Sequence, residues 1–224
     1  MYSLLLGFLF FEIIFSQRVI MLEKNNFISV NDVINSNNVR KWIRDLNNVN
    51  TRKIYVYINS NGGDVDAGEL LINQLKYQML QNRTVECIAQ NAYSMAFHLL
   101  QNCNHRYITQ SSKVMQHQIS LGLNRNSFGV IKNYLDMVSQ MSNNLEKISS
   151  NRINISINCF RQKIINEWWI YGSNIIDENI ADEIVIIGCS NDLYKTKKTI
   201  YQEQFDFNTF DIIKKKVVVD ECPL

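Results

Sequence analysis

The strongest constraint on the fold is an apolar strand that ends in a pair of glycines and leads into a helical pattern. Residues 54–58 are all β-branched or aromatic, which is typical of a buried parallel strand. Gly62 and Gly63 follow, and residues 66–77 then place Leu71, Ile72 and Leu75 on one helical face. Strand, glycine turn and helix in this order predict a layered α/β domain with right-handed crossovers.

The alternation of strands and helices continues downstream. Residues 84–89 predict a second strand, residues 94–100 a second helix, and residues 106–109 and 113–117 further strands. From residue 127 to 152, apolar residues at three- and four-residue spacing predict a long helix of about seven turns.

A serine and a histidine in this framework are the candidate nucleophile and base. Ser94 stands at a strand-to-helix junction, where its hydroxyl can project from a helix N-terminus, and His117 belongs to a later strand. Ser94 equally suits a helix N-cap, and a lone histidine in an apolar strand is ordinarily a core residue. The upstream Gly62–Gly63 pair favours chemistry because its backbone N–H groups can face an oxyanion, although Asn-Gly sequences also serve ordinary turns.

Three motifs in this order resemble the proteolytic subunit of the Clp protease, a self-compartmentalised serine peptidase with a ClpP/crotonase-type α/β fold. Tyr55–Gly63 corresponds to the YxYINSPGG strand of that family, Gln90–Met95 to its GxAASM nucleophile turn, and Val114–Ile119 to its VMIHQP strand. The resemblance extends from about Arg18 to Ile187. It implies repeated strand-turn-helix units with a long protruding handle helix.

The resemblance implies a role for each matching residue. Ser94 would be the nucleophile and His117 the general base. The N–H groups of Gly63 and Met95 would form the oxyanion hole, and Gly62 would allow the substrate backbone to approach closely.

The third catalytic residue is where the sequence departs from the family. Glu167 stands where the family has an aspartate. A glutamate can orient a histidine, but its extra methylene demands a shifted backbone. Glu167 also suits an ordinary solvent-exposed charge at a helix end. Asp177 and Asp182 are the alternatives, although Asp182 matches a structural position of the family. His98, on the helix after the serine, and His105, in a polar connection, do not match the position of the base.

Other departures indicate a divergent member whose substrate pocket and ring contacts can differ. Gln90 replaces the glycine that opens the nucleophile motif, and Tyr93 replaces a small residue before the serine. Asn61 and Ile119 replace the prolines of the first and third motifs.

The helix at 127–152 resembles the family's handle segment, which packs against its counterpart in the opposite ring. An ordinary packing role on the core fits the same apolar stripe. Leu121, Gly122 and Leu123, just before the helix, correspond to the place where the family's handle binds substrate as an added strand.

The function implied by the resemblance is that of a serine endopeptidase subunit in an ATP-dependent protease that degrades unfolded proteins to short peptides. Such subunits assemble into stacked heptameric rings, and mixed rings with a paralogue are an alternative. Because the chamber excludes folded proteins, the implied partner is an AAA+ unfoldase; no cofactor or metal is required.

Two rival functions remain. A catalytically impaired ring subunit that acts as a scaffold is supported by Glu167 and Gln90 and opposed by Ser94 and His117. An acyl-CoA enzyme of the crotonase type would share the fold and the oxyanion hole, but would have no reason for the serine–histidine pair.

One domain suffices, because 224 residues with 46% apolar content can bury a large core. We expect an apolar N-terminal segment at 1–17, a peptidase domain at 18–190 and a C-terminal tail at 191–224, irregular from Phe205 onward. The net charge of +2 gives no argument for binding nucleic acid.

The cysteines and the N-terminal segment bear on localisation. Segment 1–17 is too short for a comfortable membrane span and lacks a basic start, so a role at the axial entrance of a ring or against the unfoldase is favoured, with membrane association left open. We expect a cytoplasmic protein or one inside a plastid or mitochondrion. The five cysteines lack metal-site spacing and predict reduced thiols: Cys87, Cys103, Cys159, Cys189 and Cys222.

Overall fold

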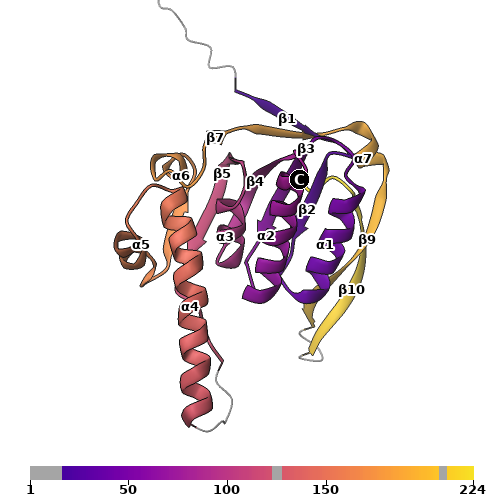
Figure 1. The fold of residues 1–224 in the computed structure, drawn as a ribbon. Coiled ribbons are helices and arrows are strands. Elements are labelled where there is room, and N and C mark those ends of the chain that lie inside the picture. Colours follow the sequence, from indigo (N-terminus) through magenta and orange to yellow (C-terminus); the bar gives the residue numbers. More distant parts are fainter. Residues whose placement is uncertain (1–16, 123–127, 207–210) are drawn as a thin grey trace, which may run out of the picture.

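A six-stranded sheet lies at the centre of the computed structural model, which describes residues 17–122, 128–206 and 211–224 (Figure 1). The sheet order is β2-β3-β4-β5-β6, with β7 beside β5; β2 to β5 are parallel to one another and β6 is antiparallel to β5. The strands are β2 (Phe27–Asn31), β3 (Lys53–Ser60), β4 (Thr84–Tyr93), β5 (His105–Gln116), β6 (Trp168–Tyr171) and β7 (Glu183–Ile184).

Three helices cover one face of this sheet (Figure 1). They are α1 (Ser36–Asn48), α2 (Val65–Leu80) and α3 (Met95–Gln101), and each follows a parallel strand of the sheet. Their buried side chains, among them Trp42, Leu71 and Phe97, form the main hydrophobic core with the strands beneath. The predicted strand-turn-helix units are therefore confirmed for β3–α2 and β4–α3.

The opposite face is covered by a smaller layer. It contains β1 (Val19–Leu22), which pairs in parallel with β8 (Ile186–Cys189), and the short helix α7 (Asn191–Lys195). A second apolar cluster joins this layer to the sheet and includes Tyr57, Ile88 and Leu193. Burial on both faces explains the uninterrupted apolar run at residues 54–58 of β3.

The long helix α4 (Phe128–Arg152) extends beyond the end of the sheet (Figure 1). The predicted helix at 127–152 is confirmed, apart from residue 127, which lies outside the described residues. Two short helices follow, α5 (Ile157–Ile164) and α6 (Asn174–Asp177). The buried residues of α4, which include Val138 and Leu145, anchor it to the rest of the domain.

The C-terminal residues form a hairpin, so the expectation of irregular structure from Phe205 onward is wrong. Strand β9 (Lys197–Asp206) pairs antiparallel with β10 (Asp211–Asp220). The run Val217–Val219 in β10 is β-branched and suits a strand, but it follows three lysines that obscure the strand pattern.

Four of the five cysteines are paired, so the expectation of reduced thiols is wrong for them. Cys87 is bonded to Cys103, and Cys189 to Cys222; exposed Cys159 is free. The Cα atoms of the two pairs are 5.8 Å and 5.9 Å apart, which is ordinary disulfide spacing. The pairs join elements that are distant in sequence, so spacing along the chain could not predict them.

None of the helices that the structure describes combines the length and the apolar character that a membrane span requires. The apolar segment 1–17 that we considered for membrane association lies outside the described residues, except for Gln17.

Candidate active site

Three neighbouring parallel strands end at the same edge of the sheet, and a candidate site residue follows each of them. Gly62 comes shortly after β3, Ser94 directly after β4, and His117 directly after β5. The carboxyl ends of parallel strands are where α/β folds generally place ligands and chemistry. The fold therefore brings together three motifs that are well separated in sequence.

Ser94 and His117 are in contact. The Oγ atom of Ser94 lies 2.9 Å from Nε2 of His117, and both residues are half-buried. Ser94 has φ 53° and ψ −119°, a conformation that is unfavourable for an L-residue and costs about 1–3 kcal/mol. Its N–H group donates to the Met115 carbonyl (2.9 Å), which ties the turn to β5. Strained turns of this kind project a nucleophile between a strand and a helix.

The hydroxyl of Ser94 does not serve as a helix cap. The residue occupies the N-cap position of α3, yet its side chain makes no capping hydrogen bond. By contrast, Asp64 at the start of α2 accepts from the N–H of Ala67 (2.7 Å), as an N-cap normally does. The Ser94 hydroxyl is therefore directed to His117 rather than to its own helix.

The glycine turn packs directly on the serine turn. Gly62 has φ +84°, and a Cβ atom added there would lie 2.4 Å from the carbonyl oxygen of Tyr93 and 2.8 Å from both the Met95 nitrogen and the Ser94 Cβ. These neighbours are backbone or Cβ atoms, which cannot rotate away. Only glycine fits at this position, both in conformation and in space.

Two backbone N–H groups beside the serine are free. Within the described residues, the amides of Gly63 and Met95 donate to no acceptor, whereas the Gly62 amide donates to Ser60 Oγ (3.1 Å). Met95 is the first residue of α3, so its amide also carries the partial positive charge of a helix N-terminus. Free amides beside a candidate nucleophile are a feature that an oxyanion hole requires.

The carboxylate of Glu167 is turned away from the histidine. Gln116 pairs with Trp168 at the end of the β5–β6 ladder, and His117 and Glu167 are the residues directly beyond that pair. The Glu167 carboxylate nevertheless accepts a hydrogen bond from the Trp169 indole (3.0 Å). Within the described residues, the histidine–carboxylate contacts shorter than 4.0 Å all belong to His105. The Glu167 residue itself has φ 55°, in the left-handed region.

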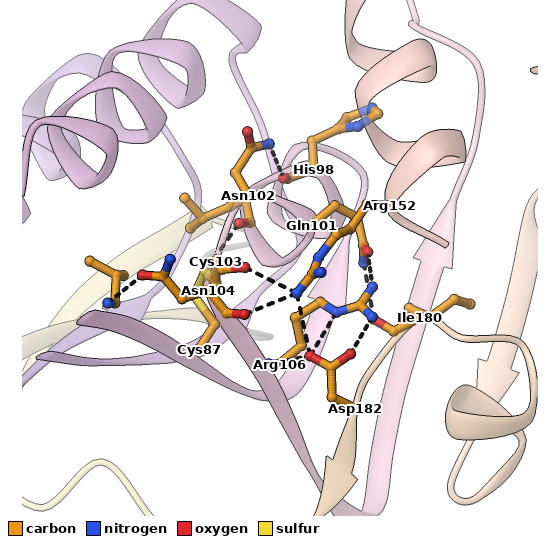
Figure 2. The surroundings of a disulfide bond; sticks show 12 residues. Cys87, His98, Gln101, Asn102, Cys103, Asn104, Arg106, Arg152, Ile180 and Asp182 are labelled. Atoms are coloured by element: carbon orange, nitrogen blue, oxygen red, sulfur yellow. Dashed lines mark hydrogen bonds and ion pairs between the residues drawn. A yellow bond between two sulfur atoms is a disulfide. The ribbon is translucent and has the colours of Figure 1, made fainter. Parts of the chain in front are cut away.

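The two alternative acids lie elsewhere. Asp177 is exposed on α6, and Asp182 forms an ion pair with buried Arg106 (Figure 2). The Arg106 backbone N–H and Nε donate to Asp182 Oδ2 at 2.9 Å and 3.1 Å, and a third bond joins the side chains. Burial alone would raise the pKa of the Asp182 carboxyl, but the hydrogen bonds and charge of Arg106 outweigh it and hold the pKa below its usual value. Asp182 is therefore a structural residue.

The predicted substrate-binding segment is only partly described. Leu121 and Gly122 follow β5 outside any strand; the side chain of Leu121 is exposed, and a Cβ added at Gly122 would meet nothing within 4 Å. Leu123 lies outside the described residues. The space beside Gly122 is thus open, as an added strand would need.

Sequence reasoning missed two side chains that border the site. Trp169 holds the Glu167 carboxylate and packs edge-on against Tyr93, with ring centroids 5.0 Å apart. Gln116, directly before His117, is buried and donates from Nε2 to the His117 carbonyl (3.2 Å). The replacement of a small residue by Tyr93 in the nucleophile motif was a signal that could have indicated Trp169. No local sequence pattern indicated Gln116.

The site offers no evident metal centre. Across residues 17–122, 128–206 and 211–224, no three side chains of histidine, cysteine, aspartate or glutamate gather as a metal ion would require.

The chemistry that the arrangement can perform is that of a serine polarised by a histidine, next to two backbone donors on a layered α/β scaffold. This combination defines the class of serine hydrolases.

The comparisons narrow this class to a family. A Clp protease family model matches residues 11–187, which is well over half of the chain. A search of curated proteins finds no match. The chain belongs to the Clp protease family, and the α/β fold with a long protruding helix is the ClpP/crotonase-type fold that the sequence motifs predicted.

Proposed function

We propose that this chain is a catalytically active serine endopeptidase subunit of a self-compartmentalised protease. The observation that carries the proposal is the 2.9 Å contact between Ser94 Oγ and His117 Nε2 on a strained turn. Membership of the Clp protease family supports a peptidase rather than an acyl-CoA enzyme. The oxyanion hole common to both would not require the serine–histidine contact.

In the proposed reaction, Ser94 Oγ attacks the carbonyl carbon of a peptide bond while its proton passes to His117 Nε2. The resulting oxyanion accepts hydrogen bonds from the amides of Gly63 and Met95, which have no other acceptor among the described residues. His117 then protonates the leaving amine as the C–N bond breaks. Water, deprotonated by the same imidazole, hydrolyses the acyl-enzyme and regenerates Ser94.

Glu167 is the proposed acid of the triad, and its role requires a rotation. Glu167 and His117 are the residues directly beyond the last β5–β6 pair, Trp168 and Gln116, which supports a role for Glu167 near the histidine. A rotamer change would move the carboxylate from the Trp169 indole to Nδ1 of the histidine. Because Glu167 is exposed, such a change breaks no core packing.

The assembly and partners of the proposed enzyme follow from the family. We propose stacked heptameric rings, or mixed rings with a paralogue, that enclose the site in a chamber and receive unfolded polypeptides from an AAA+ unfoldase. Residues 18–190 would form the peptidase unit, with segment 1–17 at the ring entrance and residues 191–224 as an appended C-terminal element. The proposed location is the cytoplasm or the interior of a plastid or mitochondrion.

The second candidate is a catalytically impaired ring subunit. The specific observation in its favour is the Glu167 carboxylate, which bonds to Trp169 and leaves His117 without an acid partner among the described residues. A histidine that lacks its orienting carboxylate loses about 10⁴-fold in turnover in serine proteases. The two candidates therefore differ in rate rather than in architecture.

Hydrolysis of a short fluorogenic peptide by the purified oligomer separates the two candidates. Short peptides need no unfoldase, so this assay tests the catalytic residues alone. We expect turnover that Ser94→Ala abolishes and that Glu167→Ala reduces by at least a hundredfold. Absence of turnover in an oligomer of ring mass, measured by light scattering, would support the impaired subunit instead.

A further inference from the structure

A chain of three buried polar side chains connects the base of the proposed site to the long helix. Gln116 Nε2 lies 2.8 Å from His98 Nε2, and His98 Nδ1 lies 2.7 Å from Ser149 Oγ. Gln116 and His98 are 3% and 4% exposed, and Ser149 is fully buried. The three residues come from the end of β5, from α3 and from α4, so they span the elements that surround the site.

The hydrogen bonds fix the tautomer of His98. Gln116 Nε2 also lies 3.2 Å from the carbonyl oxygen of His117, which can only accept. The atom facing that carbonyl must therefore be the amide nitrogen, because an amide oxygen there would repel it. The same nitrogen donates to His98 Nε2, so the proton of the His98 ring is on Nδ1 and is donated to Ser149 Oγ.

His98 is neutral over the working range of a peptidase. Burial, with a smaller contribution from the charge of nearby His117, lowers the pKa of His98 to about 4. A second proton on the ring would point an N–H group at the amide nitrogen of Gln116 and break the chain. The buried network is therefore intact whenever His98 has its single proton.

Filling the core with this polar chain costs free energy of folding. The Oε1 atom of Gln116 is buried and has no hydrogen-bond partner within the described residues, which costs about 1–3 kcal/mol. Apolar side chains of the same shape would avoid this cost and would pack equally well. The amide is useful at this position if its two N–H groups hold other groups in place, and one of them donates to the backbone carbonyl of His117.

We infer that Gln116, fixed by His98 and Ser149, is a positioning residue that sets the backbone of His117 and couples it to α4. The inference rests on the proposed function, because it assigns a role relative to the proposed base. Both protons of the Gln116 amide are used, one on the His98 ring and one on the His117 carbonyl. A shift of α4 would move Ser149, the His98 ring, the amide and then the base.

The test uses Gln116→Met, which keeps the shape of the side chain and removes both donors, in the full-length oligomer. We expect the melting temperature to be unchanged or higher, the rate of Ser94 acylation by a fluorophosphonate to fall about 10- to 100-fold, and KM for a peptide to be unchanged. Ser149→Ala should show a smaller loss of rate. The matched control is Ser150→Ala, since the hydroxyl of buried Ser150 has, among the described residues, the Lys147 carbonyl of its own helix as its hydrogen-bond partner.

A second readout does not depend on activity. The chain has three histidines, so selective isotope labelling gives three resolvable imidazole signals. We expect His98 to be the Nδ1–H tautomer, and Gln116→Met to shift the signals of His98 and His117 but not that of His105. An Nε2–H tautomer for His98, or an unshifted His117 signal in Gln116→Met, would overturn the inference. Wild-type protein that is unreactive toward the probe would refute only the proposed function, because the spectra still report the network.

Discussion

Replacing Gly62 with alanine perturbs the contact between the glycine turn and the serine turn. The added Cβ would lie 2.4 Å from the Tyr93 carbonyl oxygen, about 1 Å short of the 3.4 Å at which ordinary contact begins. The two turns must therefore separate by about that distance, and a 1 Å misplacement at an active site costs roughly 10²-fold in rate. The φ of +84° adds about 1–2 kcal/mol of strain.

We expect Gly62→Ala to lower the rate of Ser94 acylation by a fluorophosphonate about a hundredfold, and to lower the free energy of unfolding by 1–2 kcal/mol or more. The rate is measured by gel fluorescence over time, and the stability by chemical denaturation. Because any strained glycine would lower stability, the rate needs a matched control.

Gly172 provides that control. It has φ +59°, and an added Cβ would approach only the Gln110 carbonyl, at 3.1 Å. It follows β6 at the end opposite Glu167, away from the serine. Gly172→Ala should lose about 1–2 kcal/mol of stability and keep the acylation rate. Wild-type acylation in Gly62→Ala, or an equal loss of rate in Gly172→Ala, would refute the reasoning.

Three further predictions concern the two carboxylates. Trp169→Phe removes the indole N–H that donates to Glu167 but keeps an aromatic ring against Tyr93. Loss of this hydrogen bond, worth about 1 kcal/mol, should favour rotation of the carboxylate toward His117 and raise peptide turnover about fivefold. Unchanged or slower turnover would count against the proposed rotation. Asp182→Asn leaves Arg106 buried without a charge partner and should cost about 3 kcal/mol in denaturant unfolding; a loss below 1 kcal/mol would contradict this role. The pKa of Asp182 is lower in the folded protein than in the unfolded chain, where it is about 4. The stability that Asp182 contributes is therefore present above about pH 4 and is lost as the pH falls through the folded pKa. Wild-type protein should lose more stability below about pH 4 than Asp182→Asn does.

The parts of the fold that could be predicted are those with local patterns. The strand at 54–58, the glycine pair and the helix at 66–77 follow from alternation and turn chemistry within one stretch of chain. The strands predicted at 106–109 and 113–117 are the two paired portions of β5, which the register shift opposite Ala89 and Asn91 separates. The polar residues between them signalled the irregularity but not the continuity of the strand.

The parts that could not be predicted depend on contacts between distant residues. The pairing of Cys189 with Cys222 requires the C-terminal hairpin to return to β8, and no local pattern encodes that return. The orientation of Glu167 depends on Trp169, whose indole N–H donates to the Glu167 carboxylate. His98 was considered only as a base, because its hydrogen bond is to Ser149 on α4, 51 residues further along the chain.

The most direct test of the central claim is fluorophosphonate labelling of the purified oligomer, with the modified peptide identified by mass spectrometry. The contact between Ser94 and His117 predicts labelling at Ser94 that is absent in Ser94→Ala and abolished or strongly slowed in His117→Ala. His105→Ala is the matched control, since His105 lies by Asp182 and Glu183 rather than by the serine, and it should label as the wild type does. An assembled oligomer that does not label, or labelling at Ser94 that persists in His117→Ala, would contradict an activated nucleophile.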